Sequence, residues 1–164
     1  MSHTVSFAVL GVPTPKGSFT RMPGGQMLPA GTNESRKRGE TWRQDVREAA
    51  RVAMGEREPF TGAIRLMADF ALTYPKSSVR KWQMGWYPPT KKPDVDKLLR
   101  SVCDHLTGIV WADDSQVCWV MLNKSYAWDH RSGVTLDVTE LDEVSLRAYA
   151  SSREQVQSAL RALQ

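Results

Sequence analysis

The sequence predicts a single α+β domain in which a mixed β-sheet packs against helices. Its 164 residues are enough to bury a hydrophobic core without support from disulfides or metal. Segments with period-two apolar alternation, typical of half-buried strands, are interleaved with segments of helical periodicity. We expect the domain to span residues 1–142 and residues 143–164 to form a helical extension packed on the same domain.

Four segments have the alternation expected of strands. The clearest is 63–74, where apolar side chains occupy every second position and Asp69 lies on the opposite face. The other three are residues 5–10, 116–126 and 133–140. We expect these segments to build the sheet.

Three segments have helical spacing. Residues 39–54 carry one apolar stripe beside a row of arginines, and a second stripe follows Asp94 and Asp96 as far as Leu106. A third helix is expected from Val144 onward. Residues 16–38, rich in Gly, Pro and basic residues, predict a loop, and residues 75–93 predict a flap that mixes basic and aromatic side chains.

The charge is uneven along the chain. The net charge of +4 divides into +8 for residues 1–92 and −4 for residues 93–164. The sequence has no apolar run of membrane-spanning length and no signal peptide, so we expect a cytoplasmic protein. Cys103 and Cys118 lie in apolar segments without Cys or His partners at metal-site spacing, which predicts buried, reduced thiols.

Acidic residues are concentrated in the segment KKPDVDKLLRSVCDHLTGIVWADDSQV, residues 91–117. Asp94 and Asp96 open the predicted helix, and Asp113 and Asp114 follow its end. Taken singly, the first pair has a simpler explanation as a helix cap and the second as a turn. Together they predict a site for a divalent cation, because carboxylate oxygens are the ligands that Mg²⁺ prefers. We expect the two pairs to converge in space.

The basic first half favours a polyanionic partner, because cations bind phosphate and aromatic side chains stack on unpaired bases, and we expect this partner to be branched DNA. A solvated basic surface without any partner is the simpler alternative.

The same segment resembles the signature of the RusA family of Holliday-junction resolvases, which runs approximately [KR]-P-D-x-D-N-L-x-K, D-A-L-T and V-W-x-D-D-x-Q-V. The PTPKGS stretch and the basic loop after it are similar to those of phage-borne relatives. The resemblance implies a mixed α/β fold, a homodimer, and magnesium-dependent nicking of four-way DNA junctions. The location would be the bacterial host cytoplasm if the protein is phage-encoded. Manganese is expected to substitute for magnesium.

The resemblance also implies roles for individual residues. Asp94, Asp96 and Asp114 match the catalytic, metal-binding carboxylates, and Asp113 is their neighbour in the metal set. Two positions depart from the pattern, since Lys97 replaces the family's Asn and Arg100 replaces its catalytic-region Lys. Arg100 keeps a positive charge for stabilising the transition state. The residues expected to hold the DNA backbone are Lys16, Arg21, Lys91, Lys92 and Lys97.

Two other functions fit parts of the sequence. A branched-DNA-binding protein of the same fold, with catalysis weakened by the changes at Lys97 and Arg100, would need no metal. A metal hydrolase acting on small phosphates would use the acids but would leave the basic first half without a purpose.

Overall fold

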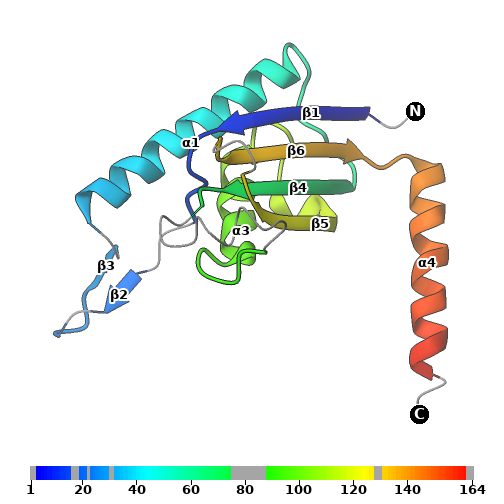
Figure 1. Ribbon diagram of the computed structural model, residues 1–164. Coiled ribbons are helices and arrows are strands. Elements are labelled where there is room, and N and C mark those ends of the chain that lie inside the picture. The colour runs from blue at the N-terminus through cyan, green and yellow to red at the C-terminus, as the bar shows by residue number, and fades with distance from the viewer. Residues whose placement is uncertain are drawn as a thin grey trace.

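The computed structural model describes residues 3–15, 19–21, 23–29, 32–74, 88–127 and 131–161. These form a four-stranded sheet, a small two-stranded sheet and three α-helices (Figure 1). In chain order the elements are β1 (His3–Leu10), β2 (Phe19–Arg21), β3 (Met27–Pro29), α1 (Asn33–Met54), β4 (Ile64–Leu72), α3 (Val95–Leu106), a short 3-10 helix (Asp114–Gln116), β5 (Val117–Tyr126), β6 (Gly133–Glu140) and α4 (Glu143–Arg161). The predicted α+β class is confirmed.

The main sheet has the strand order β1-β6-β4-β5 and is mixed. β6 runs antiparallel to both β1 and β4, whereas β4 and β5 are parallel. Parallel neighbours need a crossover connection, and α3 lies in the one between β4 and β5. This crossover carries all four acids of the predicted site.

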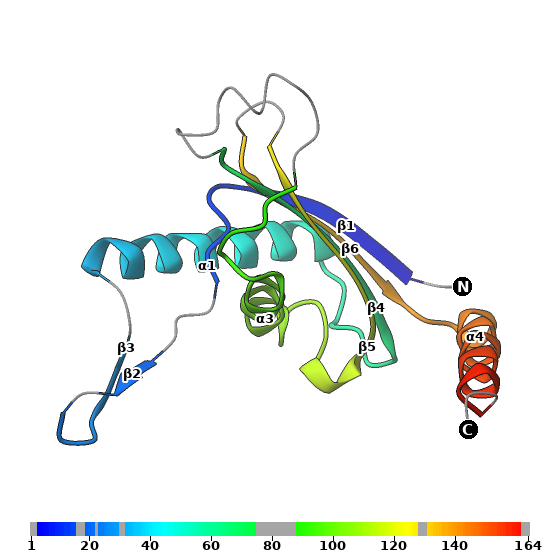
Figure 2. The ribbon, with the colours of Figure 1, turned by 60° about the horizontal axis from the view of Figure 1, so that its bottom comes forward.

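The core lies between one face of the sheet and the helices α1 and α3, which Figure 2 shows on the same side of the sheet. The alternation of β4 places Ile64, Leu66 and Phe70 in the core with at most 1% of each residue exposed. Trp42 of α1 and Val102 of α3 pack into the same cluster. Burial of these side chains anchors both helices against the sheet.

The pairing of β1 with β6 requires a glycine. Leu10 faces Gly133 across this ladder, and a Cβ on Gly133 would lie 2.3 Å from the carbonyl oxygen of Val9. No side chain fits at that distance without moving the backbone. Gly133 therefore lets the two strands approach at the start of β6.

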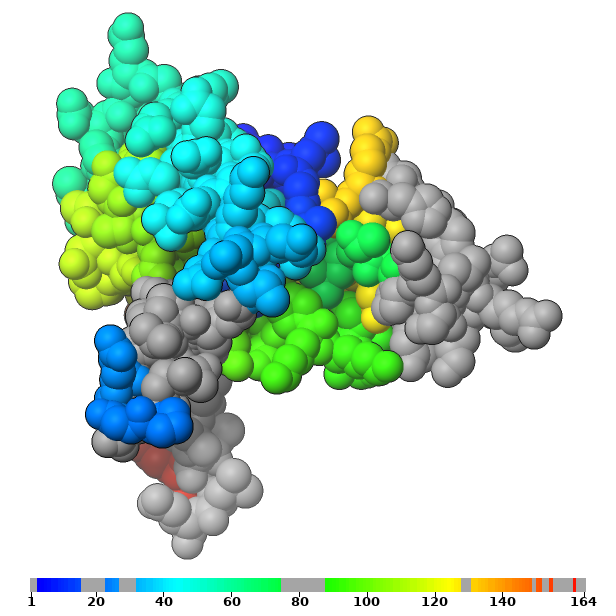
Figure 3. All heavy atoms as spheres, turned by 90° about the vertical axis from the view of Figure 1, so that its left-hand side faces the viewer, coloured from blue at the N-terminus to red at the C-terminus, as the bar shows by residue number. Residues whose placement is uncertain are grey.

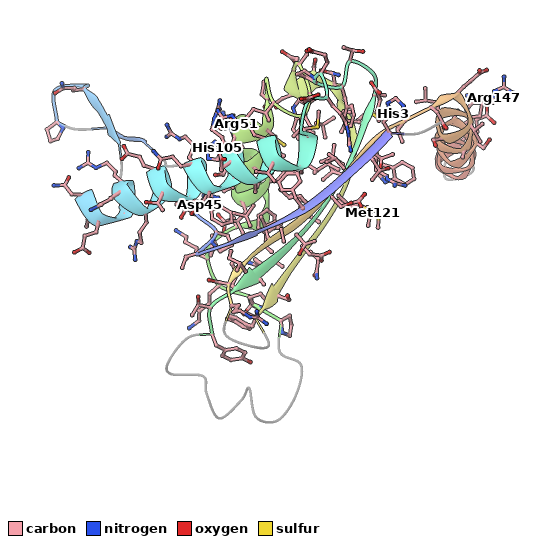
Figure 4. All side chains as sticks on the ribbon, turned by 90° about the horizontal axis from the view of Figure 1, so that it is seen from above. His3, Asp45, Arg51, His105, Met121 and Arg147 are labelled. Atoms are coloured by element: carbon pink, nitrogen blue, oxygen red, sulfur yellow. The ribbon has the colours of Figure 1, made fainter. Side chains whose placement is uncertain are left out.

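Within the described residues, no helix covers the opposite face of the sheet. Figure 4 shows Met121 on the side of the sheet away from α1 and α3, and this residue is 49% exposed. Asp69 is also exposed, as predicted from its position opposite the core-facing residues of β4. Arg65 donates a hydrogen bond to Thr139 (3.1 Å) and lies 5.9 Å from the ring centroid of Trp119.

The prediction that residues 16–38 form a loop is wrong for two segments. β2 and β3 form a short antiparallel hairpin, and α1 begins at Asn33 instead of residue 39. The hydroxyl oxygen of Thr32 accepts a hydrogen bond from the backbone N–H of Ser35 (3.2 Å), which caps the helix. The first buried residue of α1 is Trp42, so its first turns project past the sheet (Figure 1) and have no apolar stripe to reveal them.

Both cysteines are free, as expected, but their predicted burial is wrong for one of them. Cys103 is partly buried in α3, and burial raises the pKa of its thiol to about 12. Cys118 is exposed and lies on β5 at the register shift between the pairs Ile64–Val117 and Arg65–Trp119.

Helix α4 stands beside the sheet with its axis directed away from it (Figures 1 and 2). Two of its apolar side chains, Val144 and Leu146, are exposed. The packing of this helix on the same domain stays a prediction. Among the described residues, no helix combines the length and the hydrophobicity needed to cross a membrane.

Candidate functional site

Asp94 lies at the N-cap position of α3, where its extended backbone (φ −73°, ψ 139°) starts the helix. Its side chain forms no capping hydrogen bond. The carboxylate instead pairs with Lys97, whose Nζ lies 2.9 Å from Asp94 Oδ2. The hydrogen bond and the positive charge of Lys97 hold the pKa of Asp94 below its usual value, and Asp94 raises the pKa of Lys97 in turn. The side chain of Asp94 therefore does not cap the helix, and its carboxylate is paired with the ammonium group of Lys97.

Asp96 lies in the first turn of α3 and its side chain is exposed. The buried stripe of the helix, with Leu98 and Val102 at its centre, turns the opposite face outward. Arg100 is exposed one helical turn after Asp96, and residues four apart are neighbours on a helix surface. The two acids and Arg100 are thus available to a ligand that approaches the start of α3.

The turn before Asp94 is held by a lysine from β5. Lys124 Nζ donates hydrogen bonds to the carbonyl oxygens of Lys91 (3.1 Å) and Pro93 (2.9 Å). These bonds tie the end of β5 to the start of α3 and fix the direction from which the chain enters the helix. Sequence reasoning gave Lys124 no role, and no local motif marks it because its partners are backbone atoms about thirty residues away.

Asp113 has a structural task. Its Oδ1 accepts a hydrogen bond from the backbone N–H of Ser115 (2.8 Å), and its own N–H donates to Gln116 Oε1 (2.8 Å). This reciprocal pair is a capping box for the 3-10 helix. The hydrogen bonds from Ser115 also lower the pKa of Asp113. The structure therefore supports the simpler, turn-forming explanation for this acid.

Asp114 is held in a different way. Its Oδ1 accepts a hydrogen bond from Trp111 Nε1 (3.0 Å), and the hydroxyl of Thr107 lies in hydrogen-bonding contact with the same oxygen. Trp111 is fully buried and Thr107 is the C-cap of α3, so both partners are fixed by the core. The residue remains exposed, and its carboxylate is presented to solvent in a defined orientation. Sequence reasoning missed both of these supporting residues.

Gln116 joins the turn to a neighbouring loop. Its Nε2 donates hydrogen bonds to the carbonyl oxygens of Phe60 and Gly62, both at 2.9 Å, while its Oε1 accepts from Asp113. One side chain therefore bridges three backbone groups from two segments. This accounts for a glutamine at this place without any direct role in chemistry.

The two acidic pairs lie at opposite ends of α3. Asp94 precedes the first residue of the helix, whereas Asp114 contacts Thr107 at its C-terminus. A helix rises about 1.5 Å per residue, so these ends are roughly 20 Å apart. Within the described residues, no three acidic, histidine or cysteine side chains gather closely enough to hold a metal ion. The predicted convergence of the two pairs thus does not occur within one chain.

The donors present at the start of α3 still fit a hard cation. Magnesium is commonly bound by one or two carboxylates together with waters and substrate phosphates, so a full protein cage is not needed. Asp94 and Asp96 can provide such a pair, and the ammonium beside Asp94 shows that the position accepts positive charge.

Basic residues surround this end of the molecule. Figure 3 shows the segment around the start of α3 on the same face as the N-terminal half of α1. The exposed cations of these two segments are Arg36, Lys37, Arg38, Arg43, Lys91, Lys92, Lys97 and Arg100. Lys16 and residues 75–87 lie outside the described residues, and Arg21 is described only as part of β2.

Comparison with known proteins identifies the family of the chain. The family model described as endodeoxyribonuclease RusA matches residues 12–139, which include every element from β2 to the end of β6 except its last residue. The chain therefore belongs to the RusA family, and the resemblance noted from the sequence is confirmed.

Two curated proteins are similar to parts of the chain. A crossover junction endodeoxyribonuclease rusA of Lactococcus phage r1t is 26% identical over 86 residues, which cover 52% of this chain and 62% of that protein. An uncharacterized protein YqaN of Bacillus subtilis (strain 168) is 36% identical over 61 residues, covering 37% of this chain and 43% of that protein. The similarity thus spans less than two thirds of either relative.

Proposed function

We propose that the protein is a magnesium-dependent, structure-selective endodeoxyribonuclease that resolves Holliday junctions and related branched DNA by paired phosphodiester nicks. Membership of the RusA family supports this function, as does the similarity to a phage crossover junction endodeoxyribonuclease. The observation that carries the proposal is the pair of carboxylates at the start of α3, which the fold presents to solvent amid exposed lysines and arginines.

In this proposal each residue has a separate task. Asp94 and Asp96 hold the cation, which when bound lowers the pKa of a water and neutralises phosphate charge. The lysines of the turn, Lys91 and Lys92, bind the DNA backbone by charge attraction. Arg100 lies one turn from Asp96 and donates to the phosphate oxygens as negative charge develops on them. Asp113, which caps the 3-10 helix through Oδ1, has a structural task in this proposal.

Asp114 needs a second subunit to take part. Its position about 20 Å from Asp94 in one chain is too far for both to bind one ion. We propose a homodimer in which Asp114 of one subunit completes the site at the start of α3 in the other. A twofold dimer also matches the near-twofold symmetry of a four-way junction, so two such sites would cut paired strands.

The first test is nicking of a labelled synthetic junction with and without magnesium, alongside duplex, fork and flap substrates. We expect Asp94→Asn to bind the junction and to lose magnesium-dependent nicking. Junction binding by the unmodified protein without any product would instead favour a branched-DNA-binding protein with weakened catalysis. The ion pair between Lys97 and Asp94 is the observation that favours this second function.

The second test separates a shared site from one confined to a single chain. We expect the Asp94→Asn and Asp114→Asn proteins to be inactive alone under both arrangements. In a mixed dimer, a shared arrangement restores one complete site, because the intact Asp114 of one subunit meets the intact Asp94 of the other. We therefore expect mixing the two variants to recover single-strand nicking, and continued inactivity of verified mixed dimers would contradict the shared site.

A further inference from the structure

Lys97 occupies the position directly after the second acid, where the family pattern has Asn. Its ammonium lies 2.9 Å from Asp94 Oδ2, and the two side chains are 46% and 44% exposed. Residues three apart on a helix are neighbours, so the pair forms within the first turn of α3. An asparagine there would carry no charge to offer the carboxylate.

The other cations near Asp94 are placed differently. Lys124 is engaged with two backbone carbonyl oxygens, and Lys92 is exposed without an ion pair to Asp94 among the described residues. Lys97 is thus the ammonium that makes direct contact with a carboxylate proposed to hold the metal. A magnesium ion binds oxygen at about 2.1 Å, and two cations repel each other when they share one carboxylate. A metal ion bound to Asp94 therefore weakens the attraction between this carboxylate and the ammonium of Lys97.

We propose that Lys97 is an exchangeable internal counter-ion, which holds Asp94 in the metal-free protein and transfers to a DNA phosphate when a divalent cation takes its place. This inference rests on the proposed metal site. Lys97 then couples the two binding events. A metal ion at Asp94 releases Lys97 to contact a DNA phosphate, and a phosphate bound to Lys97 releases Asp94 to bind the metal ion. Such a coupling is reciprocal, so DNA must strengthen metal binding by the factor by which metal strengthens DNA binding.

The test measures Mn²⁺ affinity directly, from the electron paramagnetic resonance signal of the free ion, on the full chain. Without DNA, Lys97→Asn should bind Mn²⁺ about two- to fivefold more tightly than the unmodified protein, as expected for removal of a half-exposed ion pair. Lys97→Arg keeps a cation in place and should bind like the unmodified protein. Lys91→Asn removes the same charge from the preceding turn without removing an ion pair, and should change the affinity less than twofold.

A second measurement adds a four-way junction made uncleavable by modified phosphates. We expect the junction to increase the Mn²⁺ affinity of the unmodified protein by a larger factor than that of Lys97→Asn. Equal Mn²⁺ affinities for Lys97→Asn and the unmodified protein without DNA, or an equal effect of the junction on both, would overturn the exchange.

Failure of the metal site itself gives a different result. Asp94→Asn should lose most Mn²⁺ binding if the proposed site is correct. Unchanged Mn²⁺ binding by Asp94→Asn would remove that site, and with it both the proposed function at Asp94 and the exchange. Loss of binding in Asp94→Asn together with no effect of Lys97→Asn would overturn the exchange alone.

Discussion

Gln116→Ala should destabilise the protein more than its partly exposed position suggests. The change removes two hydrogen bonds to the carbonyl oxygens of Phe60 and Gly62 and one from the N–H of Asp113. Each bond is worth about 0.5–1.5 kcal/mol net, and water can replace part of this at a half-exposed site. We therefore expect the free energy of unfolding to fall by about 2–3 kcal/mol, and Tm by roughly 4–12 °C for a chain of this size.

Urea and thermal unfolding followed by circular dichroism measure this loss. Gln44→Ala is the matched control, because Gln44 is exposed on α1 and alanine is a good helix former. We expect that control to stay within about 0.5 kcal/mol of the unmodified protein. An equally small effect of Gln116→Ala would refute the conclusion that this side chain joins the acidic turn to the loop before β4.

Three further predictions test other parts of the structure. Trp111→Phe removes the N–H that holds Asp114, so we expect a stability loss of about 1–3 kcal/mol by urea unfolding and weaker nicking by the folded variant. Gly133→Ala places a methyl group against the carbonyl of the facing β1 strand, and should cost about 1–3 kcal/mol in thermal unfolding. At pH 8, Ellman's reagent should label exposed Cys118 quickly, and Cys103 only after unfolding because its raised pKa keeps that thiol protonated.

Each of these predictions has a result that would contradict it. Normal nicking by a well-folded Trp111→Phe protein would show that Asp114 needs no support from the indole. Gly39→Ala, at a helical position where a Cβ would lie 3.5 Å from a Thr14 methyl carbon, is the control for Gly133→Ala and should be neutral or stabilising. Equal thiol labelling rates in the folded protein would contradict the burial of Cys103.

The sheet could be predicted because its strands bury one face. The alternation of β4 appears in the sequence and returns in the structure as buried residues at every second position. The first turns of α1 could not be found in this way, because residues 33–41 are largely exposed and have no apolar stripe. Their signal was the N-cap threonine at position 32 followed by an acid in the first turn, Glu34.

The sequence contains a signal for the role of Asp113 but not for the role of Asp114. Asp113 and Gln116 have the spacing of a capping box, which identifies the first acid as structural. The donor to Asp114 lies three residues earlier, at Trp111. Spacing alone does not show that this indole is buried with its N–H directed at the carboxylate, so the support for the second acid required coordinates.

The direction of the strands in the crossover explains why the two acidic pairs do not converge in one chain. A helix that returns to a parallel strand runs antiparallel to it, so the end of the strand, and not its beginning, comes back to the start of the helix. Lys124, near the end of β5, accordingly contacts the turn before Asp94, while Asp114, just before β5, lies beside Thr107. The topology therefore brings Lys124, not the third acid, to the turn before the carboxylate pair of a single chain. If all three acids bind one ion, as we propose, the site has to be built between subunits, and the mixed-dimer experiment tests this consequence of strand direction.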